Sequence, residues 1–353
     1  MPNRRAFFRT IAGATAGVYM ARRGNALRAQ TPPARRQVML GGRRIRVVDV
    51  HAHWDMPLGD VVKGTPFENR ATGPGLEDRL AGMDGLGIDV AALTVNDFWW
   101  WEVKDQGLAR AICTKHNETL AQWCRQHPDR FVAMASVPLQ FPEVAAEMMQ
   151  DAVRRLGARG VTVGGHVNGE SLSMPKYDVF WAKAAELGEL VFMHPNGSAN
   201  IIQQGALAGR GGLGNIVGNP LETTVFLSRL IFDGTFDKFP ALRVCGAHAG
   251  GYLPSYLGRT EVACQRAGQT CIIKKRPSEY LRSQVLADSM VFSPEGLRHL
   301  VAEMGVGQVV FGTDTPFNWP VTVDLIVNAP FLSNAEKEAI LGGNLIKLLR
   351  LPA

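Results

Sequence analysis

Four histidines and one aspartate have the chemistry of a metal centre with an adjacent acid or base: His51, His53, His194, His248 and Asp314. Imidazole nitrogens and carboxylate oxygens are common ligands of divalent transition ions. A histidine also exchanges protons near neutral pH, so one member of the set can serve as a general acid or base. Each residue alone is compatible with a structural role, such as a hydrogen-bonded loop histidine or a capping aspartate. Their pattern along the chain is what indicates a common site.

The spacing of His51 and His53 suits two ligands of one ion, because strand side chains two residues apart project from the same face. They end the first apolar run that predicts a strand, and His194, His248 and Asp314 follow the fifth, sixth and eighth such runs. In a barrel of parallel strands these carboxyl ends meet at one mouth. The sequence therefore predicts one metal site built from distant segments.

The elements that must position these residues are short β-branched runs alternating with amphipathic stretches, which is typical of βα units. The predicted strands are Ile45–Val50, Asp89–Val95, Phe131–Val137, Gly160–Val163, Leu190–Met193, Leu242–Ala247, Val285–Ser289 and Gln308–Phe311. The predicted helices are Leu76–Leu86, Gln106–Gln126, Pro142–Leu156, Tyr177–Leu187, Leu221–Phe232 and Pro294–Met304. We expect a single α/β domain over residues 44–353, a (β/α)8 TIM barrel with the metal site at its C-terminal mouth. The alternative is an open doubly wound sheet, but no Gly-rich phosphate motif follows the first strand.

Several motifs are shared with one known group of proteins. They are Asp49-Val50-His51-Ala52-His53, His166-Val167-Asn168, Phe192-Met193-His194-Pro195, Pro220-Leu221-Glu222-Thr223-Thr224, Phe236-Asp237-Lys238-Phe239-Pro240 and the segment Phe311 to Phe317. With them, the sequence resembles the amidohydrolase superfamily, and within it the branch of 2-amino-3-carboxymuconate 6-semialdehyde decarboxylase and the resorcylate decarboxylases. The resemblance covers nearly all of residues 46–320.

The resemblance implies that His51, His53, His194 and Asp314 bind one divalent metal ion, and no organic cofactor is needed. Three nitrogens and a carboxylate suit Zn²⁺, while the ligand types leave Mn²⁺ open. His248 is then the catalytic acid or base. The alternatives are that His248 is a fifth metal ligand or that its role is structural.

The same resemblance suggests substrate-binding residues. Arg259 and Arg70 match arginines that hold substrate carboxylates in the family. The family's counterpart of Arg259 reaches into the site of the neighbouring subunit, which implies a homodimer. Surface ion pairs are the alternative for both. Trp99 could wall an unsaturated substrate, although core or dimer packing explains the Phe98–Trp101 run equally well. His166 and Asn168 could contact substrate, but hydrogen bonding behind the site is the preferred interpretation. The remaining histidines, in or beside predicted helices, receive no role: His116, His127 and His299.

The predicted function is metal-dependent, non-oxidative decarboxylation of an aromatic or unsaturated acid, so the partner is a small anionic molecule. The branch commonly has Trp after the His-Pro of strand five, whereas this chain has Pro195-Asn196-Gly197 and a Gly-rich stretch from Gly205 to Gly214. This departure puts the semialdehyde substrate in doubt. Hydrolysis of a lactone, ester or amide on the same barrel is the alternative, and a non-catalytic binding protein is a third.

The first 29 residues predict an export signal of the twin-arginine type, followed by a linker over residues 30–43. Asn3-Arg4-Arg5-Ala6-Phe7-Phe8-Arg9 precedes an apolar segment, Ile11–Met20, and we expect export, with a periplasmic mature protein. A basic tail without targeting function is the alternative. Eleven of the 38 basic residues precede Asp49 and no acidic residue does, so the rest of the chain is net acidic. Because the excess positive charge lies before Asp49, the net charge of +6 does not indicate a nucleic-acid partner.

Two further classes of structure are disfavoured. The longest uncharged apolar stretch, Thr10 to Ala21, is shorter than the roughly 20 residues of a membrane span, so we expect no membrane insertion of the mature chain. The five cysteines form no disulfide framework. Cys264 and Cys271 could pair in an oxidising compartment, but free thiols are the prediction.

Overall fold

The fold described here is that of a computed structural model, which describes residues 35–352 except 71, 96, 198–200, 267, 269 and 270. The predicted signal, residues 1–29, lies outside the described residues, as does the first part of the predicted linker. The end of that linker forms a small antiparallel hairpin of β1 (Met39–Leu40) and β2 (Arg43–Arg44). Within the described part, no helix is both long and apolar enough to cross a membrane.

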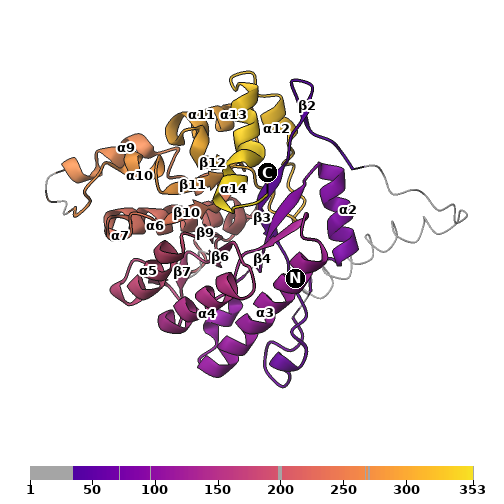
Figure 1. The fold of residues 1–353 in the computed structure, drawn as a ribbon. Coiled ribbons are helices and arrows are strands. Elements are labelled where there is room, and N and C mark those ends of the chain that lie inside the picture. The colour runs from indigo at the N-terminus through magenta and orange to yellow at the C-terminus, as the bar shows by residue number, and fades with distance from the viewer. Residues whose placement is uncertain are drawn as a thin grey trace, which may run out of the picture. The chain divides into compact units, whose positions relative to one another are not determined.

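The centre of the fold consists of parallel strands in two sheets, as the alternating sequence pattern predicted (Figure 1). One sheet has the order β3 (Val48–His53), β4 (Val90–Thr94) and β5 (Phe131–Ala133). The other has the order β12 (Val309–Val310), β11 (Val285–Asp288), β10 (Arg243–Gly246), β9 (Leu190–Met193) and β6 (Gly160–Val163). A separate hairpin joins β7 (His166–Val167) to β8 (Glu170–Ser171).

Backbone hydrogen bonds also link the outer strands of the two sheets at both edges. Beyond β5, the Ala135 N–H donates to the carbonyl of Gly160 at 2.8 Å. At the other edge, the Val50 N–H of β3 donates to Phe311 at 3.0 Å, and the Asp314 N–H donates to the carbonyl of His51 at 2.8 Å. The second of these edges joins the segments that carry three of the predicted metal ligands.

Helices surround the strands (Figure 1). The longer ones are α2 (Leu76–Leu86), α3 (Gln106–Gln126), α4 (Pro142–Arg154), α5 (Asp178–Leu187), α6 (Asn219–Phe232) and α11 (Pro294–Met304). Shorter ones are α7 (Thr235–Lys238), α8 (Ala247–Gly250), α9 (Leu257–Glu261), α10 (Pro277–Leu281), α12 (Asp324–Val327), α13 (Asn334–Glu338) and α14 (Asn344–Leu348). Local sequence sets several helix starts: Asp105 accepts the Leu108 N–H at 2.6 Å before α3, and Ser293 caps α11 ahead of a proline.

The strands are buried on both faces, as parallel strands covered by helices must be. Alternate residues belong to two buried apolar clusters: in β9, Leu190 and Phe192 belong to one, and Val191 and Met193 to the other. The ring of His51 packs against Phe192, with ring centroids 5.1 Å apart. The apolar cluster that contains Phe192 therefore packs directly against the polar site.

Candidate metal centre

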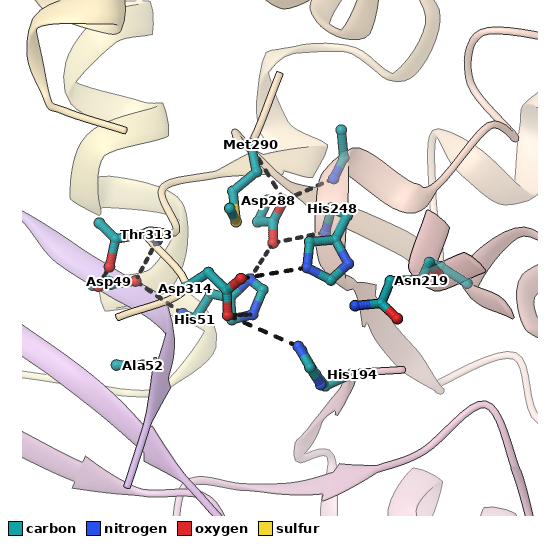
Figure 2. Close-up of polar contacts among 12 residues, drawn as sticks. Asp49, His51, Ala52, His194, Asn219, His248, Asp288, Met290, Thr313 and Asp314 are labelled. Carbon is teal, nitrogen blue, oxygen red and sulfur yellow. Dashed lines mark hydrogen bonds and ion pairs between the residues drawn. The ribbon is translucent and has the colours of Figure 1, made fainter. Parts of the chain in front are cut away.

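The four predicted ligands lie together in the interior. One possible ligand atom from each of His51, His53, His194 and Asp314 lies within 4.8 Å of the other three, and all four residues are buried. Asp314 Oδ1 lies 3.1 Å from His51 Nε2, 3.0 Å from His53 Nε2 and 3.9 Å from His194 Nε2. Figure 2 shows Asp314 between the rings of His51, His194 and His248. Three histidines and one carboxylate thus form a candidate site for one divalent ion.

Hydrogen bonds behind two ligand rings show that the donor set fits a cation. His51 Nδ1 donates to Asp288 at 2.7 Å, and His53 Nδ1 lies 2.9 Å from the hydroxyl of Thr94. That hydroxyl donates in turn to the Ala52 carbonyl, so it accepts from His53. The two Nε2 atoms then face each other at 3.0 Å beside a carboxylate oxygen. Acceptor atoms this close repel one another unless positive charge lies among them.

The pKa values separate the three rings into two that stay neutral and one that holds a proton. Burial lowers the pKa of His53 to about 4 and that of His194 well below its ordinary value. Burial also acts to lower the pKa of His51, but the carboxylates of Asp314 and Asp288 outweigh it and raise the value to about 10. Burial raises the pKa of Asp314, yet the surrounding histidines hold it below its usual range. A site that binds a proton this firmly also attracts a metal cation.

His248 follows β10 and is held beside the ligands by its own backbone. Its N–H and that of Ala249 donate to the Asp288 carboxylate at 3.0 and 2.7 Å. Both residues have positive φ, 55° and 58°, and this left-handed turn sends the imidazole toward Asp314. His248 Nε2 lies 3.6 Å from Asp314 Oδ2 (Figure 2). The predicted proton-transfer residue therefore lies next to the metal ligands.

His248 also lines a half-open cavity of about 460 Å³, the His248 cavity. Apolar and aromatic side chains form most of its wall: Ile216, Tyr252, Met290, Phe292, Leu300 and Trp319. His299, to which the sequence assigned no role, lines it as well. The volume lies within the range of small-molecule sites. The predicted proton-transfer residue thus lies at a cavity that could hold a small organic molecule.

Three groups around the site were missed in the sequence, and two of them, Asp49 and Asp288, are buried. Asp288 joins His51 to the His248 turn, as described above. Asp49 accepts the His51 N–H at 2.9 Å and the Thr313 hydroxyl at 2.5 Å, so it fastens two ligand-bearing segments together. Asn219, the first residue of α6, points its amide toward the side of His194 and His248 (Figure 2). Asp49 lay within a recognised motif, but only burial distinguishes Asp288 from an ordinary strand-end acid.

Glu222 is a fourth missed group, and it holds the turn that carries His194. Its carboxylate is 1% exposed and accepts backbone N–H groups of Gly165 at 2.9 Å, Asn196 at 2.7 Å and Gly197 at 2.7 Å. The turn runs directly from β9 through His194 to Gly197. Burial raises the pKa of Glu222, although these donors and His166 act to lower it. A residue on α6 thereby fixes the loop that follows β9 and carries His194.

The predicted residues His166 and Asn168 make backbone contacts. His166 Nε2 donates to the Gly197 carbonyl at 2.9 Å, and its Nδ1 accepts the Gly169 N–H at 3.1 Å. Asn168 is exposed and donates to the carbonyl of Trp101 at 3.2 Å. Both ring nitrogens of His166 are therefore committed to the loops around the His194 turn, which agrees with the supporting role preferred from sequence.

Two other predicted substrate residues line a second cavity, of about 220 Å³. The guanidinium of Arg70 lies 4.7 Å over the ring of Trp99 and 3.5 Å from the Asp97 carboxylate. The buried His116, which the sequence placed away from the site, lines this cavity too. Arg259 lies exposed on α9, and no ion pair of it with another described residue is found. Neither arginine lines the His248 cavity.

The cysteine prediction was wrong for one pair. Cys264 and Cys271 form a disulfide, with their α-carbons 5.7 Å apart, whereas free thiols were expected. The seven-residue separation lets a loop bring them together, which spacing alone did not reveal. Among the described cysteines, Cys113, Cys124 and Cys245 are free.

Comparison with known proteins gives this site a family. The amidohydrolase profile matches residues 48–351, and the chain belongs to that family. It is 32% identical over 275 residues to 2-amino-3-carboxymuconate-6-semialdehyde decarboxylase of Dictyostelium discoideum, covering 76% of this chain and 74% of that protein. It is 29% identical over 287 residues to gamma-resorcylate decarboxylase of Rhizobium sp., covering 78% and 87%. The resemblance to the decarboxylase branch is confirmed.

A solved structure extends the likeness to the fold. The dihydroxybenzoic acid decarboxylase of Polaromonas sp. JS666, which holds manganese and the inhibitor 2-nitroresorcinol, superposes with a TM-score of 0.75. The match is 25% identical in sequence and covers 87% of this chain and 97% of that one.

Proposed function

We propose that the protein is a metal-dependent, non-oxidative decarboxylase of an aromatic carboxylic acid. The observation that carries the proposal is the joining of His51, His53, His194 and Asp314 around one point, with His248 between that point and a cavity of suitable size. The similarity to decarboxylases described above supports the same reaction class.

In the proposed reaction, His248 supplies the proton that replaces carbon dioxide. The metal, held by His51, His53, His194 and Asp314, would supply positive charge that polarises substrate oxygens. His248 Nε2 donates its proton to the ring carbon that bears the carboxylate, forming a C–H bond. The bond from that carbon to the carboxylate then breaks, its electron pair returns to the ring, and carbon dioxide leaves. The apolar wall of the cavity excludes water from the reacting carbon.

We propose Zn²⁺ as the ion, because three imidazoles and a carboxylate suit it. Manganese in the related Polaromonas structure makes Mn²⁺ the competitor. Activity of metal-stripped protein reloaded with each ion separates them: the native ion should restore full turnover at stoichiometric loading.

We further infer that the parallel strands form a (β/α)8 barrel with the site at its C-terminal mouth. The hydrogen bonds at both sheet edges support this, as does the position of each ligand within two residues of a strand end or after one. A homodimer is the proposed assembly, supported by the exposure of Arg259, which in related enzymes reaches the neighbouring subunit. Analytical ultracentrifugation tests it, since a single species of monomer mass contradicts it.

Export to the periplasm is proposed from the leader, residues 1–29, with Cys264–Cys271 as support. Disulfides persist in oxidising compartments and are rare in the cytosol. Fractionation of cells that express the full chain tests this. Replacement of Arg4 and Arg5 by lysine should leave the protein in the cytoplasm, and continued export would contradict a twin-arginine signal.

The reaction itself is tested by incubating the metal-loaded full chain with 2,6-dihydroxybenzoate and measuring carbon dioxide and resorcinol. The two products should form in equal amounts, and His248→Asn should lower the rate about 10²- to 10⁴-fold. His127→Asn, at the end of α3, is the matched control and should leave the rate unchanged. Acid release from lactones, with no carbon dioxide from any aromatic acid, would establish hydrolysis instead.

A further inference from the structure

We propose that the substrate is a monocarboxylic acid with an uncharged, largely apolar body, and that this body occupies the His248 cavity. The proposal rests on the decarboxylase function proposed above and specifies its substrate class. Some acids named for the related enzymes carry one carboxylate and others carry more than one. The proposal favours the first group as substrates.

The lining of the cavity selects for apolar groups. Exposed fractions of 51% for Ile216, 37% for Tyr252 and 47% for Phe292 leave large apolar side chains uncovered at its rim. Met290 and Trp319 also line the cavity, and the Met290 N–H donates to the Asp288 carboxylate at 3.2 Å. Uncovered apolar surface next to a catalytic group marks a binding site. An apolar body entering here would cover these side chains while its reacting carbon lies at His248.

Within one chain, the charges around the cavity disfavour a second carboxylate. None of the described residues that line it is Lys, Arg, Asp or Glu. Arg70 lies in the other cavity beside Asp97, and Arg259 is exposed on α9. A carboxylate placed among these apolar side chains would lose water without gaining a counter-charge, which is strongly unfavourable. Within one chain, the described residues offer positive charge to the substrate at the candidate metal site, where one carboxylate suffices. In the proposed dimer, Arg259 of the neighbouring subunit is the other source, and a preference for the dicarboxylate would reveal it.

The test compares substituents at one position of the same acid. The series consists of 2,6-dihydroxybenzoate with hydrogen, methyl, propyl, pentyl or carboxylate at carbon 4. Each methylene that enters the cavity should raise kcat/KM about fourfold until the cavity is filled. The 4-carboxylate should react at least about tenfold more slowly than the 4-methyl acid. Equal rates along the alkyl series, or a preference for the dicarboxylate, would overturn the proposal.

A binding measurement separates this proposal from the proposed reaction. Titration calorimetry of metal-loaded His248→Asn with 5-methylresorcinol and 5-pentylresorcinol measures the cavity without turnover. The pentyl compound should bind more tightly, and Phe292→Ala should reduce that advantage. Val179→Ala is the control, because Val179 is 40% exposed on α5 and lines neither cavity.

The outcomes of the two experiments are distinct. Chain-length-dependent binding without decarboxylation of any acid refutes the proposed reaction alone. Decarboxylation of 2,6-dihydroxybenzoate without a chain-length effect refutes the cavity assignment alone. If a second copy of the chain fills the cavity instead, pentylresorcinol affinity will rise as the protein is diluted into monomers, and the assignment to substrate will be wrong.

Discussion

Replacing Glu222 by glutamine should weaken metal binding although Glu222 is not a ligand. The carboxylate accepts three backbone N–H groups, and two of them, from Asn196 and Gly197, belong to the turn that begins with the ligand His194. An amide has one oxygen, so Glu222→Gln can keep the two bonds of Oε1 but must turn its own N–H₂ toward the Gly197 N–H. The turn then contains a buried donor facing another donor.

The size of the effect follows from that one lost acceptor. A buried N–H without a partner costs about 1–3 kcal/mol of unfolding free energy. For a chain of this length, this corresponds to a fall in Tm of roughly 1–5 °C. Residues that orient metal ligands typically change metal affinity about 10- to 100-fold when altered, and we expect a loss in that range because the turn carries His194.

The assay is competition for Zn²⁺ with a chromophoric chelator, together with the absorption spectrum of the Co²⁺-loaded protein. Glu222→Gln should show weaker competition and an altered Co²⁺ spectrum, which reports ligand geometry independently of stability. Glu147→Gln, in an exposed ion pair with Arg110, is the control and should change neither. If Glu222→Gln lowers Tm but leaves the affinity and the spectrum intact, the turn does not depend on Glu222 and the reasoning is refuted.

Three further predictions concern the same site and the disulfide. Asp288→Asn should lower Zn²⁺ affinity about 10- to 100-fold in the same competition assay; unchanged affinity contradicts this. An amide oxygen at the Oδ2 position can still accept from His51 and the His248 N–H, but the amide NH₂ then faces the Ala249 N–H, which donates to Oδ1. Since buried carboxylates raise the pKa of His51 to about 10, metal uptake at pH 7 should release about one proton and tighten as the pH rises, as a pH-indicator titration in weak buffer can measure. Reduction of the Cys264–Cys271 disulfide should lower the unfolding free energy by about 2–3 kcal/mol in urea denaturation, an effect that Cys264→Ser must abolish.

Much of the fold was predictable because hydrophobic period and turn residues agree along the chain. The bounds of β6, β9, α2, α3 and α11 are as predicted. The strand expected over Phe131–Val137 ends at Ala133. The backbone of Ser136 instead pairs with a side chain, since its N–H donates to Asn117 Oδ1 at 2.7 Å and its carbonyl accepts from Asn117 Nδ2 at 2.9 Å. A distant side chain that replaces a neighbouring strand in this way cannot be recognised from the local sequence. Helices α12 to α14 were missed because they are too short to show a period.

The ligand set was easier to predict than its support. Histidine at a strand end is rare enough to be noticed, and four such histidines with one aspartate pointed to one place. Asp288 and Glu222 carry no comparable signal, since an acid at a strand end or in the first turn of a helix is ordinary. Their role depends on burial and on partners 237 and 57 residues away, namely His51 and Gly165. Only the assembled fold brings those partners into reach.

The two buried aspartates show how the site is kept in place before any ion binds. Asp49 binds the backbone of His51 and the hydroxyl of Thr313, and Asp288 binds the ring of His51 and the turn of His248. A Cβ on Gly312 would lie 2.8 Å from Asp288 and 2.9 Å from His51, so the segment before Asp314 can pass between them only as glycine. Each aspartate therefore joins two strands that are distant in sequence. Because these bonds hold backbone as well as side chains, loss of the metal should leave the five site residues close together, while loss of either aspartate should separate them even at saturating metal.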